Sequence, residues 1–267
     1  RESTGSNPES DPEGRNMALL AILILTSMVM AQETPSTPGR DLVPKPQELT
    51  LLEGKVSLES VTVRAPEGTA KEDLLAWFKE KGIPSSPGAT EVILEASGPE
   101  DLGEEGYLLT IADRSVRIAA KGEAGRFYGV QTLRQWAEMS SGKELRAVKI
   151  RDWPVQKHRG FKGWAVRWQM PEYSAMADFM SRLKMNFLML CYGSFSESFN
   201  RFREPYPESW LKDLRGLVEF CRRRHVTLCL SLNPSIGGGN IEYSSEKDYE
   251  VIRNKCLGLG KEGVRWF

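Results

Sequence analysis

The sequence is poor in the residue types on which metal and redox sites depend. Its 267 residues include only two histidines and four cysteines, and no two cysteines have C-x-x-C spacing. Basic and acidic residues number 36 each, so the formal net charge is zero, and apolar runs long enough for repeated membrane spans are missing. These shortages exclude a polybasic nucleic-acid-binding protein and a polytopic membrane protein, and they predict neither a metal ion nor a cofactor.

The few cysteines and histidines are scattered rather than grouped. Cysteines occur at positions 191, 221, 229 and 256, within apolar patterns of the second half of the chain. We interpret them as buried free thiols, with disulfides as the alternative, because disulfide-stapled scaffolds need closer spacing. His158 and His225 lie far apart, so a metal site is not predicted.

The N-terminal segment has the composition of a targeting sequence. Residues 1–16 are polar and predict a disordered upstream segment. Residues 17–31 hold an apolar run too short for a bilayer span of about 20 residues, with small residues near its end, and predict a signal peptide. A buried apolar helix or an uncleaved anchor is the alternative. Residues 32–46 carry four prolines and predict a linker, so we expect a secreted or periplasmic protein without a stable membrane span.

Residues 47–150 have a mixed pattern that predicts a small α/β domain. Short β-prone runs occur at residues 48–52, 61–64, 91–95, 107–111 and 116–119. Helical spacing of apolar residues predicts helices over 70–81, capped by Thr69, and over 124–139. No nucleophile, acid pair or metal cluster stands out in this region, so we expect it to support a second domain.

Residues 151–267 alternate between apolar runs and amphipathic segments. The pattern predicts strands at 160–164, 186–191, 226–230 and 264–267, separated by helices at 171–184, 207–224 and 245–259. Such alternation is typical of a parallel sheet. A complete (β/α)₈ TIM barrel needs about 250 residues. We therefore expect a sandwich domain followed by the first half, strands 1–4, of a truncated barrel. A finished four-stranded flavodoxin-like domain is the alternative.

Three predicted loops follow the strands, where barrels bind their ligands. They span residues 165–170, 192–206 and 231–243, and combine aromatic rings with hydrogen-bonding groups, a mixture that suits a sugar. The candidate substrate-binding residues in them are Arg167, Tyr192 and Asn233. Glu204 follows an arginine directly, so we expect it to pair with an arginine rather than to act in catalysis.

Several segments, taken together, resemble a known group of enzymes. Three segments resemble the entry into the barrel of β-N-acetylhexosaminidases of glycoside hydrolase families 20 and 84: residues 150–154 (IRDWP), 158–164 (HRGFKGW) and 184–186 (KMN). Features of family 84, the O-GlcNAcase type, occur at residues 203–207 (REPYP), 243–249 (YSSEKDY) and 263–267 (GVRWF). The small domain that precedes the barrel in both families is similar to residues 105–107 (EGY) and 125–133 (GRFYGVQTL).

The resemblance implies an exo-glycosidase that removes N-acetylglucosamine-type residues from glycans with retention of configuration. In such enzymes the 2-acetamido oxygen of the substrate attacks the anomeric carbon, assisted by two neighbouring acidic residues. In family 84 these acids follow the fourth strand, so we expect them beyond Phe267 and expect no catalytic residue in this chain. Gly163 matches a glycine whose backbone meets the sugar in family 84. Arg167 matches, by its spacing from Arg159, a sugar-binding arginine of family 20.

Two positions depart from the family patterns and leave the function open. Tyr192 and the residues after it replace a lysine and acidic residues of family 84, and Trp164 replaces an aspartate of family 20. A carbohydrate-binding barrel without catalysis is therefore one alternative. A structural α/β module without a sugar site is another.

Overall fold

The structure, a computed structural model, describes residues 41–87, 89–140, 143–163, 170–191, 203–232, 234 and 241–267. Residues Leu42–Phe267 form one compact unit. The predicted upstream segment and signal peptide lie outside the described residues. Among the residues described, the helices are too short or too polar to cross a bilayer.

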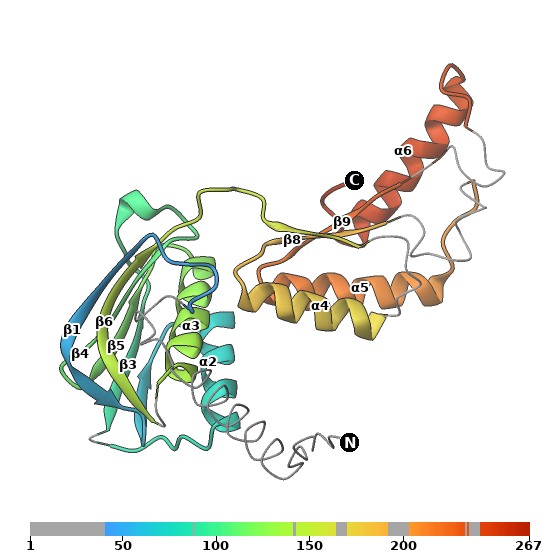
Figure 1. Ribbon diagram of the computed structural model, residues 1–267. Coiled ribbons are helices and arrows are strands. Elements are labelled where there is room, and N and C mark those ends of the chain that lie inside the picture. The colour runs from blue at the N-terminus through green and yellow to red at the C-terminus, as the bar shows by residue number, and fades with distance from the viewer. Residues whose placement is uncertain are drawn as a thin grey trace, which may run out of the picture. The chain divides into compact units, whose positions relative to one another are not determined.

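A six-stranded sheet with two helices on one face forms the first part of the fold (Figure 1). The strand order is β1-β6-β4-β5-β3-β2, with parallel pairing only at β2-β3 and β3-β5. The strands are β1 Glu48–Ser57, β2 Val61–Arg64, β3 Thr90–Glu95, β4 Tyr107–Ala112, β5 Ser115–Ala119 and β6 Glu144–Asp152. The helices are α2 Thr69–Glu80, the 3₁₀ turn η1 Glu100–Leu102 and α3 Glu123–Glu138.

Alternation along the strands explains why the helices cover one face. Strands β3 and β4 alternate buried with half-buried residues, so their apolar side chains point to a single side of the sheet. Those side chains meet the apolar stripe of α3 in one core. Fully buried members include Val92, Leu109, Ile118, Val130 and Leu133. Burying each such side chain stabilises the fold by about 1.5–3 kcal/mol.

The sequence predicts five of the six strands and misses β6. This strand reads ELRAVKIRD, in which charged residues interrupt the apolar ones, and the adjacent buried pair Ala147 and Val148 breaks the strict period of two. Nevertheless β6 lies between β1 and β4, because Leu145, Val148 and Ile150 enter the core. The domain boundary between residues 150 and 151 stays a prediction.

The start of α2 differs from the prediction. Gly68, with φ of 155°, is the N-cap, and Thr69 is the first helical residue. The Glu123 carboxylate accepts hydrogen bonds from the Ala70 N–H (2.9 Å) and the Thr69 hydroxyl (3.1 Å). Thr69 as a cap is therefore wrong, since a carboxylate from α3 satisfies the free N–H group that a cap would take.

A second, parallel sheet follows, with the order β7-β8-β9. Its strands are β7 Gly160–Lys162, β8 Phe187–Leu190 and β9 Thr227–Leu230, and its helices are α4 Met170–Arg182, α5 Glu208–Arg223 and α6 Glu246–Lys261. Beyond α6, Trp266 forms a parallel bridge with Cys229, and the Leu230 N–H donates to its carbonyl at 3.0 Å. The predicted fourth strand thus lies next to β9 as a single bridge. The Ser245 hydroxyl caps α6 by accepting a hydrogen bond from the Asp248 N–H.

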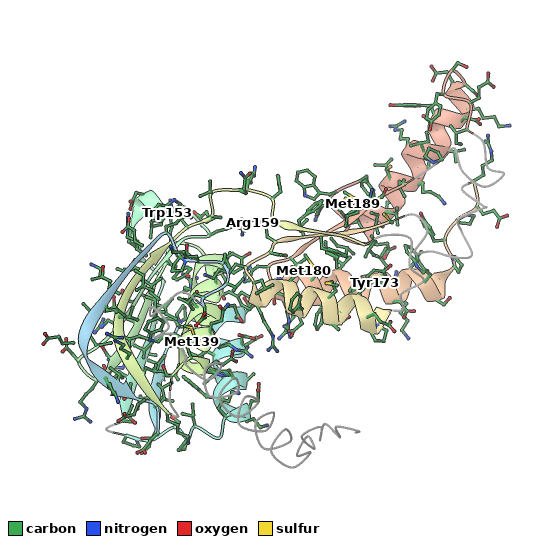
Figure 2. The ribbon with its side chains drawn as sticks, viewed as in Figure 1. Met139, Trp153, Arg159, Tyr173, Met180 and Met189 are labelled. Carbon is green, nitrogen blue, oxygen red and sulfur yellow. The ribbon has the colours of Figure 1, made fainter. Side chains whose placement is uncertain are left out.

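Helices α4 and α5 pack on the same face of this sheet (Figures 1 and 2). Leu188 and Leu190 of β8 share a face because they are two residues apart, and β9 presents Leu228 and Leu230 beside them. One apolar cluster joins these leucines to residues of both helices, including Tyr173 and Met180 of α4, labelled in Figure 2. A flavodoxin-like sheet has the strand order 2-1-3 and helices on both faces. The sequential order of β7, β8 and β9 excludes this alternative and confirms the predicted α/β class with barrel-type units.

The two sheets are joined by a buried ionic group. The Lys184 ammonium donates to the Asp152 carboxylate and to the Tyr107 hydroxyl, at 2.8 Å each. Tyr107 in turn donates to Asp152 at 2.9 Å and lies 2.5 Å from the Thr132 hydroxyl. Asp152 and Lys184 are each only 6% exposed. Burial, followed by the Asp152 charge, raises the pKa of Tyr107, and burial lowers the pKa of Lys184.

Arg159, labelled in Figure 2, forms a second link beside this group. Its Nε donates to the carbonyl of Lys184 and its Nη1 to Glu105, both at 2.9 Å. Asn186 donates to the other oxygen of Glu105 at 2.9 Å. The guanidinium also lies 5.8 Å from the centroid of the Tyr128 ring. Arg159, just before β7, and Asn186, just before β8, thus hold the same carboxylate, that of Glu105 in the loop before β4.

His225 forms the third link. It follows α5 with a φ of 56°, as Lys184 follows α4 with a φ of 59°. The His225 ring lies 2.8 Å, by its Nε2, from the Thr69 hydroxyl, and 5.0 Å, centroid to centroid, from the ring of Phe127. Burial lowers the pKa of this histidine, although Glu123 and Glu105 oppose the effect.

Replacing Lys184 with methionine should lower the free energy of unfolding by about 3–5 kcal/mol, because it leaves the Asp152 charge buried without its cation. Urea denaturation of the chain measures this. The double change Lys184→Met with Asp152→Leu should lower the free energy of unfolding by less than the sum of the losses from the two single changes. The control Lys55→Met removes an ion pair with Glu144 in which both side chains are more than half exposed, and should cost less than about 1 kcal/mol. Equal losses for Lys184→Met and Lys55→Met would contradict the prediction.

Stability should fall as the pH drops below about 6.5, the ordinary pKa of histidine. The unfolded chain binds a proton at His225 at higher pH than the folded chain does, because the folded pKa is lowered. The loss should continue until the pH reaches the folded pKa, at no more than about 1.4 kcal/mol per pH unit. Unfolding free energies at pH 7.5 and 5.5 test this, with His225→Asn as comparison, since asparagine tolerates positive φ. An unchanged pH dependence in His225→Asn would refute it.

Candidate carbohydrate site

The carboxyl ends of β7, β8 and β9 meet at one edge of the second sheet. Gly163, Cys191 and Ser231 directly follow the three strands. The Gly163 N–H donates to the Met189 carbonyl at 2.8 Å, and the Ser231 N–H donates to the Leu190 carbonyl at 2.9 Å. These bonds continue the parallel ladder past the strand ends and place the three residues side by side. In barrels this edge binds the ligand.

Gly163 is the predicted sugar contact that the structure describes at this edge. It is buried, and a Cβ added to it would lie 3.5 Å from the Met189 carbonyl and 3.8 Å from the Tyr173 ring. Those are ordinary contact distances, so the surrounding protein leaves room for alanine at this position. The described neighbours therefore do not require glycine at this position, and the contact of Gly163 with a sugar stays a prediction.

The structure does not describe the other three predicted sugar contacts. Arg167, Tyr192 and Asn233 lie outside the described residues, so their roles as substrate contacts stay predictions. The residues described right after the strands, which are Gly163, Cys191, Ser231 and Leu232, carry no carboxylate. The described part of this edge therefore supplies backbone and a hydroxyl group but not an acid.

The Asp248 carboxylate joins a residue between β8 and α5 to a residue between β9 and α6. Asp248 accepts hydrogen bonds from both terminal nitrogens of Arg203, at 2.6 and 2.7 Å, and from the Glu242 N–H at 2.8 Å. Arg203 lies in the connection between β8 and α5, and Glu242 lies in the connection between β9 and α6. The hydrogen bonds from Arg203 and Glu242 lower the pKa of Asp248 to about 2. This pair is not predicted from the sequence, in which its only signal is an arginine and an acidic first-turn residue that flank two long loops.

Glu204 follows Arg203 and takes part in a neighbouring cluster. Its carbonyl accepts a hydrogen bond from the Lys255 ammonium at 2.9 Å. That ammonium lies 4.1 Å from the centroid of the Tyr206 ring, and Tyr206 stacks on Trp210 with centroids 4.4 Å apart. Burial lowers the pKa of Lys255 and raises the pKa of Tyr206 to about 12. The expected arginine partner of Glu204 stays a prediction.

The cysteines are unpaired, as the sequence predicts. Cys191, Cys221 and Cys229 are buried and Cys256 is partly exposed. Burial raises the pKa of Cys221 to about 12, and it raises the pKa values of Cys229 and Cys256 as well. These three thiols are therefore poor nucleophiles. Within the described residues, His, Cys, Asp and Glu side chains form no group of three that could hold a metal ion.

Two family models match the chain one after the other. The model described as glycosyl hydrolase family 20, domain 2, matches residues 40–153. The model described as β-N-acetylglucosaminidase matches residues 160–267. Their boundary falls between the end of β6 and the start of β7, where the first sheet gives way to the second.

Known proteins are similar over parts of their length. A β-hexosaminidase of Porphyromonas gingivalis is 25% identical over 163 residues, which are 54% of this chain and 21% of that protein. The solved structure of CpGH84B is 23% identical, with a TM-score of 0.70 over 85% of this chain and 43% of that chain. The β-N-acetylhexosaminidase of Bacteroides fragilis NCTC 9343 is 17% identical, with a TM-score of 0.65 over 84% of this chain and 55% of that chain.

This chain thus spans about a fifth of the curated relative and about half of the solved structures. The structural matches extend over both sheets and agree with the α/β class described above. The two consecutive family models and the curated relative confirm the resemblance found in the sequence: the chain is similar to hexosaminidase-type glycoside hydrolases.

Proposed function

We propose that the chain is the N-terminal part of a glycoside hydrolase that removes N-acetylglucosamine-type residues from glycans. The observation that carries the proposal is the succession of two hexosaminidase-type family matches, one on each sheet. The parallel order of the second sheet supports it, because that order brings the three strand ends to one edge, as a barrel requires. The substrate class is carbohydrate, and no cofactor is proposed.

The reaction proposed is hydrolysis with retention of configuration, assisted by the substrate. The 2-acetamido oxygen of the sugar attacks the anomeric carbon while the bond from that carbon to the leaving oxygen breaks. One acidic residue orients the amide, and its neighbour protonates the leaving oxygen. Water then opens the cyclic intermediate and restores the acetamido group. We place this acidic pair beyond Phe267, so the chain itself would supply one side of the sugar pocket.

Within that pocket, the first three strands would hold the sugar rather than react with it. The Gly163 backbone lies at the ligand edge, and a hydrogen at Cα leaves space for close approach. Arg167, Tyr192 and Asn233 are the proposed side-chain contacts, since the arginine and the amide can bind hydroxyl groups and the ring can stack on a sugar face.

A longer gene product that carries this chain should release the chromophore from a chromogenic N-acetylglucosaminide, and the chain alone should not. The reason is that the proposed acids lie beyond Phe267. Initial-rate assays of both proteins measure this. Turnover by the chain alone would refute the placement of the acids. If the longer product binds N-acetylglucosamine without turnover, it is a carbohydrate-binding barrel, and if it does not bind at millimolar concentration, it is a structural module.

A pair of glycine variants tests the sugar contact in the same assay. Gly163→Ala in the longer product should raise KM several-fold, because the methyl group occupies the space proposed for the sugar, while the fold tolerates it. Gly216→Ala is the matched control, since its added methyl group, on α5, meets nothing within 4 Å. KM values that respond equally to both changes would contradict a role for Gly163 in binding.

We further propose that the protein is exported, to the periplasm or the medium. The support is the apolar run within residues 17–31, which ends in small residues before a polar, proline-containing segment. Expression in a bacterial host should yield a mature protein that begins at Gln32. Intact-mass measurement and N-terminal sequencing of the secreted fraction check this. Retention of residues 17–31 in a membrane fraction would instead indicate an uncleaved anchor.

A further inference from the structure

A pocket of about 240 Å³ lies beside the buried ionic group that joins the two sheets. Its floor is made of four buried residues, Tyr107, Tyr128, Asp152 and Lys184. Exposed residues, among them Lys45 and Val155, form its rim, so the pocket opens to solvent. Lys184 precedes β8, and Arg159, which also lines the pocket, precedes β7. The pocket therefore lies at the amino ends of these strands, opposite to the ligand edge.

The Lys184 ammonium has one N–H group more than the surrounding protein uses. An ammonium carries three donors. Among the residues that the structure describes, it has two acceptors, the Asp152 carboxylate and the Tyr107 hydroxyl. The Lys184 side chain is only 7% exposed, and a buried charged donor without an acceptor is unfavourable. Because Lys184 lines the pocket, the occupant of the pocket can supply the third acceptor.

The carboxylate beside this ammonium can accept a further hydrogen bond. Asp152 Oδ2 accepts from Lys184 and Tyr107, at 2.8 and 2.9 Å, whereas Oδ1 accepts from the Gln47 N–H at 3.3 Å. An ionised carboxylate has about four acceptor sites. The pocket thus offers a donor and an acceptor on adjacent side chains. A hydroxyl group, which both donates and accepts, can use both.

The charges around the pocket are paired. Lys184 contacts Asp152, and a second cation, Arg159, donates to Glu105 at 2.9 Å. All four of these side chains line the pocket. An added anion would meet two carboxylates at close range, and their repulsion disfavours it. A neutral ligand therefore fits the pocket better than an anion does.

The walls of the pocket are rings. Tyr128 is fully buried, and Trp153, labelled in Figure 2, is half-buried, with Pro154 next to it in the chain. Aromatic rings of this kind stack on the apolar faces of a sugar. The volume is somewhat below the range of about 300–1,000 Å³ that is typical of drug-sized ligands. The pocket therefore fits a single sugar ring rather than a longer chain.

We propose that this pocket is a second carbohydrate site, which binds one neutral sugar unit at the amino ends of β7 and β8. A sugar hydroxyl accepts the third N–H of Lys184 and donates to Asp152, while Trp153 and Tyr128 flank the ring. Binding here does not require the acids placed beyond Phe267, so the inference is independent of the proposed function. It gives the first domain, which the sequence predicts only as a support, a contact with the glycan.

Protein-observed NMR of the chain, titrated with N-acetylglucosamine and with glucose, tests the pocket. The indole N–H signal of Trp153, assigned by its loss in Trp153→Phe, should shift and saturate with at least one of the sugars. We expect a dissociation constant of about 1–10 mM, because so small a ligand makes few contacts. The Gln47 N–H, which donates to Asp152, should shift with the same constant. Absence of saturable shifts at both groups with both sugars would overturn the proposal.

Variants locate the binding, with the Gln47 N–H as the reporter. Trp153→Ala should raise the dissociation constant at least about fivefold, because it removes a wall of the pocket. Phe179→Ala is the matched control, since Phe179 is an aromatic residue of α4, 58% exposed, that does not line the pocket. Equal effects of these two changes, or binding that is lost in Gly163→Ala and kept in Trp153→Ala, would overturn the proposal. Acetate that shifts the same signals at lower concentration than the sugars do would identify an anion site and would overturn it as well.

Discussion

The contact between the Lys184 ammonium and the Asp152 carboxylate is the interaction on which the arrangement of the two sheets depends. It brings a cation from the turn before β8 to an anion at the end of β6, in a place where both side chains are almost fully buried. A buried charge without its partner is costly, so the second sheet cannot move away from the first unless both ions regain water. Tyr107 and Thr132 extend the pair into a network that belongs to the core of the first sheet. The ligand edge is thus built on strands anchored at their opposite ends.

Much of the fold could be predicted from the sequence, because its signals are local. The helices over residues 69–80 and 208–223 follow from apolar spacing, and the parallel strands follow from their position between amphipathic helices. Strand β6 could not be predicted, since its place between β1 and β4 is decided by pairing with distant strands rather than by its own pattern. The Thr69 cap failed for a related reason: its competitor, Glu123, is 54 residues away.

The location of the candidate site could be predicted from the sequence, but the contacts between its side chains could not. Loops after parallel strands indicate where a ligand binds, and Gly163 was placed there by its likeness to a family motif. The partner of Arg203 could not be read from the sequence, because Asp248 lies 45 residues further on and its neighbours offer several other carboxylates. Which acid an arginine selects depends on the geometry of the folded connections, and here that geometry favours the buried acid at a helix start, where the helix dipole also favours a negative charge.

The three helix-to-strand turns of the second sheet share one backbone feature, a residue with positive φ. Lys184, His225 and Gly263 each have positive φ and precede β8, β9 and the bridge at Trp266. Glycine adopts this conformation with the least strain and asparagine tolerates it, so lysine and histidine are locally unfavourable at these positions. Lys184, however, carries a side chain that reaches the first sheet, and His225 carries one that reaches helices α2 and α3, whereas Gly263 has no side chain. At two successive turns the backbone is therefore strained while the side chain makes a contact with the first part of the fold. Replacing Lys184 or His225 with glycine would relieve the backbone strain of that turn and remove the contact.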